Sequence, residues 1–192
     1  MADLIFYTGP MGSAKTAHAL MTNFQYTERG KKVWLIKPAI DTREHVRYGD
    51  YGNVLQTLVK SRIGLEAWAD AIGYEDDIIP PITANIIICD EAQFLSAKQV
   101  DQLKMIADTM GITVLCYGLR TDFQSNLFEG SKRLFELASS IQMFPVICDC
   151  GNAAVINARM VDGNIITEGA QVDIGGDEKY RAFCYACWKR NS

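Results

Sequence analysis

The stretch that most constrains the fold of this chain is IFYTGPMGSAKTAHAL, residues 5–20. An apolar run stops at Gly9, and Lys15 and Thr16 then open an amphipathic segment. This order closely matches the phosphate-binding loop G-x-x-x-x-G-K-[ST], in which backbone N–H groups and a helix N-terminus surround phosphate oxygens. Ala14 stands where the motif has its second glycine. An alanine there is unstrained in right-handed helical geometry, and it costs on the order of 1 kcal/mol if φ is positive.

A pair of carboxylates strengthens the interpretation of this loop as a nucleotide site. In IIICDEAQF, residues 86–94, an apolar run ends in Asp90 and Glu91. Phosphate-loop folds need an acidic group at the end of a neighbouring strand to organise Mg²⁺, and a hydroxyl acceptor needs a base beside it. Neighbouring residues at a strand end point in different directions, so two carboxylates can divide these tasks. The alternative is purely structural, with Asp90 or Ser96 as a helix N-cap.

Apolar runs alternate with helical patterns through the first three quarters of the chain. Strands are predicted at 4–8, 33–37, 85–90 and 112–117. One predicted helix stops near Gly30, and its apolar face is made by Ala17, Leu20, Met21 and Phe24. A second stops at Gly111, and its apolar face is made by Val100, Leu103, Ala107 and Met110. A shorter helix is predicted at 132–140, a loop with an irregular surface strand at 41–62, and turns at 73–83. The fold class is therefore α/β, with a phosphate-loop (RecA-like) parallel sheet flanked by helices.

The pattern changes near residue 145 to short β segments, with a hairpin turn predicted at Asp162-Gly163. We expect two domains, an α/β domain over 1–145 that binds the nucleotide and a small β-rich domain over 146–192.

The cysteines fall into two groups. Of six cysteines, Cys89 and Cys116 lie in apolar strand-like runs, where a thiol acts as a small hydrophobe. The other four form two pairs, Cys148/Cys150 and Cys184/Cys187. In a reducing cytosol such pairs indicate a metal rather than disulfides, and C-x-x-C is half of a tetrahedral zinc site. We expect a structural Zn²⁺ held by four thiolates, which stabilises a module too small to build a large core of its own.

Composition excludes several classes. Among 192 residues, 48% are hydrophobic and 22% are charged, which favours a packed core over disorder. The net charge of −4 offers no electrostatic basis for binding DNA or RNA, so no nucleic-acid partner is expected. No apolar run approaches the ~20 residues of a membrane span, so no membrane partner is expected. MADLIFYTG lacks a basic region and a cleavage site, and a cytoplasmic location is expected.

Five segments in a fixed order resemble one known family. They are GPMGSAKT, KPAIDTR, DEAQF, YGLRTDFQSNLFEGS and IGGDEKY, and the similarity runs over roughly residues 2–188. The chain resembles the thymidine kinases of the cellular and bacterial type, which have a zinc-bearing lasso domain. The resemblance implies transfer of the γ-phosphate of ATP to the 5′-hydroxyl of thymidine, a homotetramer, and feedback inhibition by thymidine triphosphate.

The resemblance also implies site residues. Glu91 falls on the catalytic base. The expected contacts to ATP and its Mg²⁺ are Gly9, Pro10, Met11, Gly12, Ser13, Ala14, Lys15, Thr16, Asp41, Arg43, Asp90 and Gln93. The expected contacts to the nucleoside are Phe123, Gln171, Val172, Asp173, Ile174, Gly175 and Tyr180. Arg120 is a second cation for the transferring phosphoryl group, after Arg43. Cys148-Asp-Cys150 departs from the C-x-x-C of many members and marks a subgroup.

Two other functions compete. DEAQ after a strand also occurs in helicases, so the chain could be a RecA-like ATPase acting on nucleic acid with a zinc ribbon, although its length and acidic charge argue against this. A zinc-ribbon interaction module with a decayed nucleotide site is the third possibility, motivated by Ala14. His18 and His45 are expected to be polar surface residues.

Overall fold

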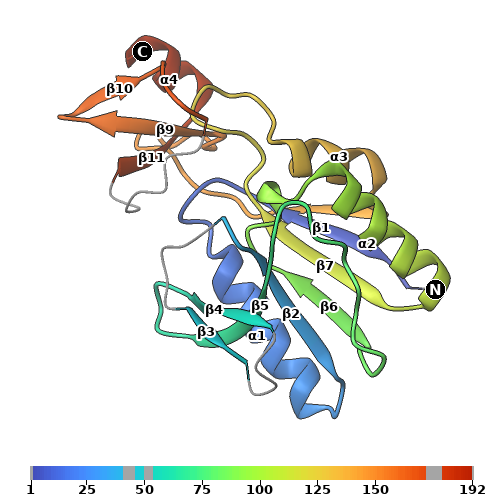
Figure 1. Cartoon of the computed structure of the whole chain (residues 1–192). Helices are drawn as coiled ribbons and strands as arrows, with labels where there is room; N and C mark the ends of the chain where they lie inside the picture. The colour runs from blue at the N-terminus through green and yellow to red at the C-terminus, as the bar shows by residue number, and fades with distance from the viewer. Residues whose placement is uncertain (1, 41–45, 50–53, 172–178, 192) are drawn as a thin grey trace.

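The computed structural model of the chain describes residues 2–40, 46–49, 54–171 and 179–191 (Figure 1). Within these residues a large sheet has the strand order β3-β4-β5-β2-β6-β7-β1-β8. Its strands are β1 (Leu4–Thr8), β2 (Val33–Pro38), β3 (Val46–Tyr48), β4 (Leu55–Lys60), β5 (Glu66–Ile72), β6 (Ile86–Cys89), β7 (Thr113–Gly118) and β8 (Ser140–Met143). The helices beside this sheet are α1 (Lys15–Glu28), the 3₁₀ turn η1 (Ala92–Phe94), α2 (Ala97–Met110) and α3 (Glu129–Leu137).

The sheet is mixed rather than purely parallel. Strands β5, β2, β6, β7, β1 and β8 pair in parallel, which confirms the predicted α/β core. Strands β3, β4 and β5 pair antiparallel at one edge. This antiparallel edge departs from the expected parallel sheet, because antiparallel neighbours such as β4 and β5 can be joined by a short turn and need no crossover helix.

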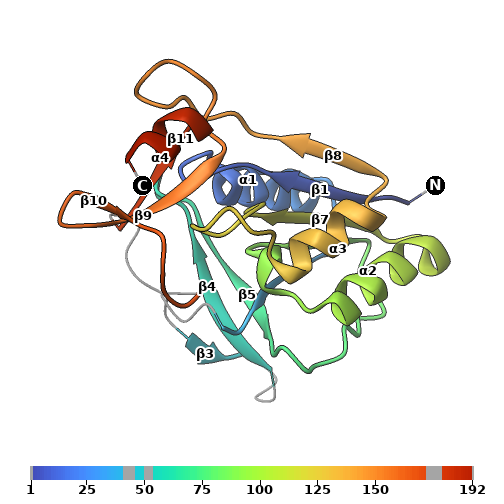
Figure 2. The ribbon, with the colours of Figure 1, turned by 90° about the horizontal axis from the view of Figure 1, so that it is seen from above.

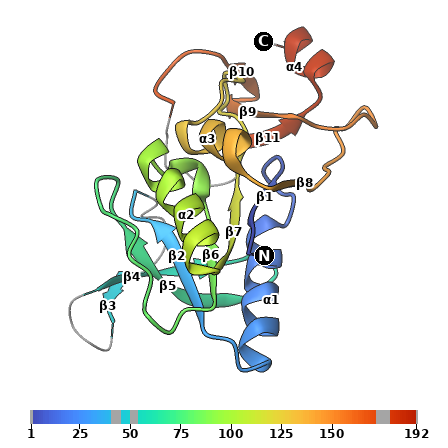
Figure 3. The ribbon, with the colours of Figure 1, turned by 90° about the vertical axis from the view of Figure 1, so that its right-hand side faces the viewer.

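Helices cover both faces of the sheet, as Figure 3 shows. On one face α2 and α3 pack Val100, Leu103 and Leu134 against strand residues such as Phe6 and Ile87. On the other face α1 packs Ala19 and Leu20 against a cluster that includes Leu35, Ile88 and Tyr117. The core strands β6 and β7 are buried on both sides, which explains why they read as continuous apolar runs.

The sequence predicts the C-terminal end of α2 correctly, but it predicts only part of the buried face of α1. Ser96 caps α2 in a reciprocal capping box with Gln99, and Gly111 ends the helix at φ 68°. On α1, Met21 and Phe24 are 46% and 63% exposed, so the predicted apolar face is wrong at those two positions. The buried residues are Ala17, Ala19 and Leu20, because the small alanines allow α1 to approach the sheet closely.

The remaining residues build a second sheet with its own core. Strands β9 (Ile156–Val161), β10 (Asn164–Ile166) and β11 (Tyr180–Phe183) pair antiparallel, and α4 (Tyr185–Asn191) follows. The β9–β10 hairpin turns at Asp162-Gly163, as predicted, with φ angles of 48° and 82°. Cys148, Ala154, Ala158, Phe183 and Cys184 form the core of this part, which we call the cysteine module. The module lies beyond the carboxyl end of β1, opposite the N-terminus (Figure 2).

Two strands escaped the sequence patterns. Strand β5 lies in a stretch for which the sequence predicts no strand, and β8 begins at Ser140, the last residue of the segment predicted as helix 132–140, because α3 stops at Leu137. Strand β8 is fully exposed at the sheet edge and pairs with β1, so tertiary pairing rather than burial holds it. Among the helices of the described ranges, none combines the length and apolar character that a bilayer span requires.

Candidate active site

The loop after β1 has the form of a phosphate cradle. It occupies residues 9–14 between β1 and the first turn of α1, as the motif predicts. The Lys15 ammonium folds back over the loop, where Nζ donates to the carbonyl oxygens of Gly9 and Pro10 at 3.0 and 2.9 Å and lies 3.1 Å from the Ser13 hydroxyl. A positive charge and the N-terminus of α1 therefore meet at one point, which favours an anion there.

Ala14 has the positive φ that explains why the motif usually has a glycine at this position. It caps the start of α1 at φ 61° and ψ 22°, in the left-handed region. An L-residue pays roughly 1–2 kcal/mol for this geometry. The loop therefore keeps its shape despite Ala14, at the cost of local strain.

Asp90 lies buried at the carboxyl end of β6 and faces the loop. Its Oδ1 accepts a hydrogen bond from the Thr16 hydroxyl at 3.4 Å, so the predicted Thr16 and Asp90 come together. The carboxyl is 3% exposed. Burial, with a smaller contribution from the charge of Glu91, raises the pKa of Asp90 to about 7, although the Lys37 ammonium opposes the shift.

Glu91 is held by Gln93 in a strained position. Glu91 has φ 52°, in the left-handed region that is uncommon for a residue with a side chain. Nε2 of Gln93 donates to Oε2 of Glu91 at 2.6 Å, and Oε1 of Gln93 accepts from the Leu119 N–H at 2.9 Å. The Gln93 side chain is 2% exposed and lies directly against Gly118, where a Cβ would come within 2.8 Å of its oxygen. Gln93 therefore connects the Glu91 carboxylate rigidly to the backbone after β7.

The predicted nucleoside residues Phe123, Gln171 and Tyr180 gather around the turn 121–126. Asp122 fixes this turn, since its Oδ1 accepts from the N–H groups of Gln124 and Asn126 at 2.9 Å each. Its Oδ2 accepts from the Gln171 side chain at 2.8 Å.

Arg159 from β9 completes the group. Its guanidinium carbon lies 3.9 Å from the centroid of the Phe123 ring, and its Nη2 donates to the Tyr180 hydroxyl at 3.0 Å and to the Ala170 carbonyl at 3.1 Å. Phe123 is almost fully buried beneath this cation. Its ring therefore holds the Arg159 guanidinium in place by a cation–π contact.

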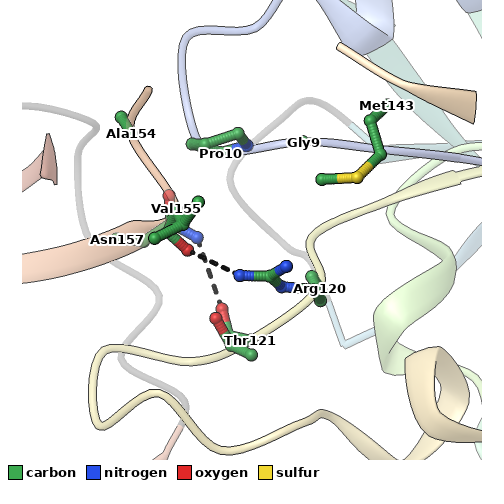
Figure 4. A pocket seen from close by; sticks show the side chains of 8 residues that line it. All are labelled: Gly9, Pro10, Arg120, Thr121, Met143, Ala154, Val155 and Asn157. Atoms are coloured by element: carbon green, nitrogen blue, oxygen red, sulfur yellow. Dashed lines mark hydrogen bonds between the residues drawn. The ribbon is translucent and has the colours of Figure 1, made fainter. Parts of the chain in front are cut away.

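Figure 4 shows where the cysteine module meets the phosphate loop. A small pocket there is lined by Gly9, Pro10, Arg120, Thr121, Met143, Ala154, Val155 and Asn157. Oδ1 of Asn157 accepts from the Met11 N–H at 2.7 Å, and its Nδ2 donates to the Thr121 carbonyl at 3.3 Å. Nη2 of Arg120 donates to the Val155 carbonyl at 3.3 Å, which places this cation at the junction.

The four predicted metal ligands converge. The sulfur atoms of Cys148, Cys150, Cys184 and Cys187 all lie within 4.8 Å of one another, and those of Cys150 and Cys184 are 3.5 Å apart. Tetrahedral zinc with four bonds of about 2.3 Å to sulfur requires sulfur separations of about 3.8 Å. The donor set and its spacing therefore suggest a zinc site.

Several predicted residues lie outside the described part of the chain. They are Asp41 and Arg43 on the phosphate side, and Val172, Asp173, Ile174 and Gly175 on the nucleoside side. His45 also falls there. His18 differs from its expected surface position, because it is half-buried among Tyr7, Tyr117 and Phe144, with Nδ1 3.0 Å from the Tyr117 hydroxyl.

Asn157 and Arg159 are not among the residues that the sequence predicts for the site. A signal was present, since two large polar residues stand two apart in the strand INARMV, on one face of β9. Both are buried, and buried polar side chains in a strand need partners. Those partners, Met11 and Tyr180, are distant in the sequence.

Comparisons with known proteins identify the family of this chain. A profile of the thymidine kinase family matches residues 2–188. The chain is 42% identical to a thymidine kinase of Zymomonas mobilis subsp. mobilis over 96% of this chain and 94% of the relative. It is 40% identical to a thymidine kinase of Enterobacteria phage T4 over 98% and 96%, respectively. Among solved structures, the large terminase from a thermophilic bacteriophage aligns over 74% of this chain and 40% of its own, at 14% identity and a TM-score of 0.45.

The strand–loop–helix start, the Asp90-Glu91 pair and the four-cysteine cluster all fall inside the matched range. The chain therefore belongs to the thymidine kinase family of ATP-dependent phosphotransferases.

Proposed function

We propose that Glu91 is the base of this thymidine kinase and accepts the proton of the 5′-hydroxyl as that oxygen attacks the γ-phosphorus of ATP. The observation that supports this most strongly is that Glu91, which is half-buried, directly follows the buried Asp90, whose carboxylate is bonded to Thr16 at the end of the phosphate loop. Asp90 and Glu91 have different partners, Thr16 for the first and Gln93 for the second, so the two can serve different roles. A positioned base contributes about 10²- to 10⁴-fold to rate.

The phosphate side would use the loop in the usual way of such folds. The N–H groups of residues 12–16 surround the phosphates, and Lys15 leaves the carbonyls of Gly9 and Pro10 to meet the β- and γ-phosphate oxygens. Thr16 and Asp90 would hold Mg²⁺, which supplies positive charge to the phosphate oxygens. Asp41 and Arg43 remain proposals from the family resemblance, with Arg120 at the junction as a second cation.

We assign Gln93 a positioning role. Both ends of its amide are engaged, with Glu91 and with the Leu119 N–H. This arrangement aims the Glu91 carboxylate and links it to the turn that carries Phe123. Gln93 is expected from the resemblance to contact ATP, and we propose that its side chain serves the base instead.

On the nucleoside side, Phe123, Tyr180 and Arg159 would form one wall of the thymidine pocket. Gln171 would fix the start of the segment that closes over the base, because it is tied to Asp122 in the turn. Val172, Asp173, Ile174 and Gly175 complete the proposal from the resemblance, in which backbone groups read the base. A pyrimidine needs flat apolar surface with few convergent polar groups, and the partly exposed ring of Tyr180 would offer it, with the buried Phe123 packed behind Arg159.

The cysteine module would hold one structural Zn²⁺ through Cys148, Cys150, Cys184 and Cys187. Four thiolates fill all the positions of tetrahedral zinc, which suits a structural and not a catalytic ion. We propose residues 146–192 as the lasso domain and 1–145 as the ATP-binding domain, since the module has a core of its own. We also propose a homotetramer and inhibition by thymidine triphosphate, which the resemblance implies, and a cytoplasmic location. They are testable by light scattering, by inhibition assays and by cell fractionation.

The deciding experiment is a phosphorylation assay with labelled ATP across the four deoxynucleosides. We expect labelled product with thymidine and little with the three others. The competing ATPase function predicts instead that single-stranded DNA, and not thymidine, stimulates ATP hydrolysis. Stimulation by DNA without nucleoside product would replace the present proposal.

A further inference from the structure

We propose that Asn157 is a positioning residue that couples the nucleoside pocket to the phosphate loop, so that thymidine and ATP bind cooperatively. The inference rests on the proposed function, since it requires both substrates. It begins from the two hydrogen bonds of one buried amide. Asn157 is 3% exposed, accepts from the Met11 N–H of the loop at 2.7 Å, and donates to the Thr121 carbonyl at 3.3 Å.

The first bond concerns the shape of the loop. A phosphate loop works because its backbone N–H groups already point where the phosphates will lie. The Met11 N–H is occupied by Asn157, so this peptide of the loop faces the cysteine module. A side chain from the module therefore determines the orientation of a peptide in the loop.

The second step concerns strand β9. Asn157 and Arg159 stand two apart, so both side chains lie on the same face of this strand. Arg159 contacts Phe123 and the Tyr180 hydroxyl, and Tyr180 is its register partner on β11. One short strand thus contacts the aromatic wall of the proposed nucleoside pocket at one residue and the phosphate loop at another. Both side chains are buried and bonded, so the two contacts move together.

The third step concerns the turn that lies between the two sites. The Thr121 carbonyl bonded to Asn157 stands two residues before Phe123 and one before Asp122, which holds Gln171. Any ordering of this turn by a bound nucleoside reaches Asn157 directly. Coupling between ligands is reciprocal, so thymidine would tighten ATP binding by the same factor as ATP tightens thymidine binding.

The test measures that factor in the zinc-loaded full chain. Calorimetry gives the Kd of β,γ-imido-ATP with Mg²⁺, with and without saturating thymidine. For the unmodified protein we expect thymidine to lower this Kd by about fivefold or more, the lower end of typical coupling. In Asn157→Ala we expect the factor to approach one and the Kd without thymidine to rise by about 3- to 10-fold, the equivalent of one hydrogen bond.

Matched variants separate coupling from general damage. Asn164→Ala removes the same residue type from β10 of the same sheet, where the side chain is exposed and contacts a nearby carbonyl within the turn. It should keep the factor of the unmodified protein. Asn157→Leu keeps the branching at the γ carbon and removes both hydrogen bonds, so it should behave as Asn157→Ala does. Hydrogen exchange needs no variant: thymidine alone should slow exchange in a peptide covering residues 9–14.

The outcomes are distinguishable. A protein that neither binds nor phosphorylates thymidine overturns the proposed function. A protein that phosphorylates thymidine but has a coupling factor of one, or an Asn157→Leu variant with an unchanged factor, overturns the role of Asn157 alone. Unchanged exchange at residues 9–14 on addition of thymidine would do the same.

Discussion

Replacing Asp90 by asparagine should stabilise this protein in the absence of ligands while destroying its activity. The carboxyl is buried at the end of β6, and its pKa is raised from 3.8 to about 7, mainly by burial. Each pKa unit corresponds to about 1.4 kcal/mol, so an ionised Asp90 costs about 4 kcal/mol of folding free energy at high pH. The substituted amide would retain the shape and the acceptor oxygen for Thr16 without that charge.

The sign of the pH dependence follows from the direction of the shift. The folded state holds the Asp90 proton up to about pH 7, whereas the unfolded state releases it near pH 3.8. Between these values the folded state binds more protons, so the contribution of Asp90 to stability falls as the pH rises and levels off above pH 7. An amide cannot ionise, so the advantage of Asp90→Asn over the unmodified protein should grow by about 1.5 kcal/mol between pH 6 and 8.5.

Urea unfolding with zinc present and Mg²⁺ and nucleotide absent measures this difference. Asp108→Asn is the matched control, because Asp108 is exposed on α2 and pairs at the surface with Lys104. Its effect on stability should stay within about 0.5 kcal/mol. A stability difference for Asp90→Asn that is constant or shrinks from pH 6 to 8.5 would refute the reasoning. The same variant should lose most of its turnover, because the carboxylate that would hold Mg²⁺ is gone.

The remaining predictions concern the base, its support, the loop and the metal. Glu91→Gln should bind thymidine within a few-fold of the unmodified protein and lose about 10²- to 10⁴-fold in kcat, and a near-normal kcat would exclude Glu91 as the base. Gln93→Leu should lower kcat and change the pH profile of kcat while leaving the Kd of β,γ-imido-ATP nearly unchanged, whereas a residue that binds ATP would raise this Kd. Ala14→Gly should raise the free energy of unfolding by about 0.5 kcal/mol, because relief of the left-handed strain exceeds the entropy cost of glycine; Ala97→Gly, in right-handed helix α2, should lower it instead. Cys150→Ser should reduce bound zinc well below one ion per chain by metal analysis and lower the Tm, and full occupancy in this variant would contradict a four-thiolate site.

Local signals in the sequence predicted most of the parallel core. Strands β6 and β7 are apolar throughout because they are buried on both faces, and Gly111 marks the end of α2 because that position needs a positive φ. The Asp-Gly pair predicted the hairpin turn at Asp162-Gly163. The two closely spaced cysteine pairs predicted the cluster of four sulfur atoms. Such features can be predicted because they depend on residues that are close in sequence, or on cysteine, which has few structural roles besides metal binding, disulfides and core packing.

What the sequence did not show depends on distant partners. Met21 and Phe24 have helical spacing with the buried residues of α1, yet the tight contact through Ala19 and Leu20 turns them outward. Strand β8 is short and exposed, and the alternation of Ser140, Ile141, Gln142 and Met143 does not reveal that its partner is β1. The roles of Asn157 and Gln93 depend on backbone N–H groups of Met11 and Leu119, which no side-chain pattern marks.

The attachment of β8 restricts how the cysteine module can move. Strand β8 runs alongside β1 until Met143 lies beside Thr8, and the Phe144 N–H then donates to the Thr8 carbonyl at 2.8 Å. Gly9 lies so close to Phe144 that a Cβ would come within 2.5 Å of its carbonyl oxygen. The chain thus enters the module beside the first residue of the phosphate loop. Because β8 is paired with β1 along its whole length, the entry of the module stays in register with the start of the loop.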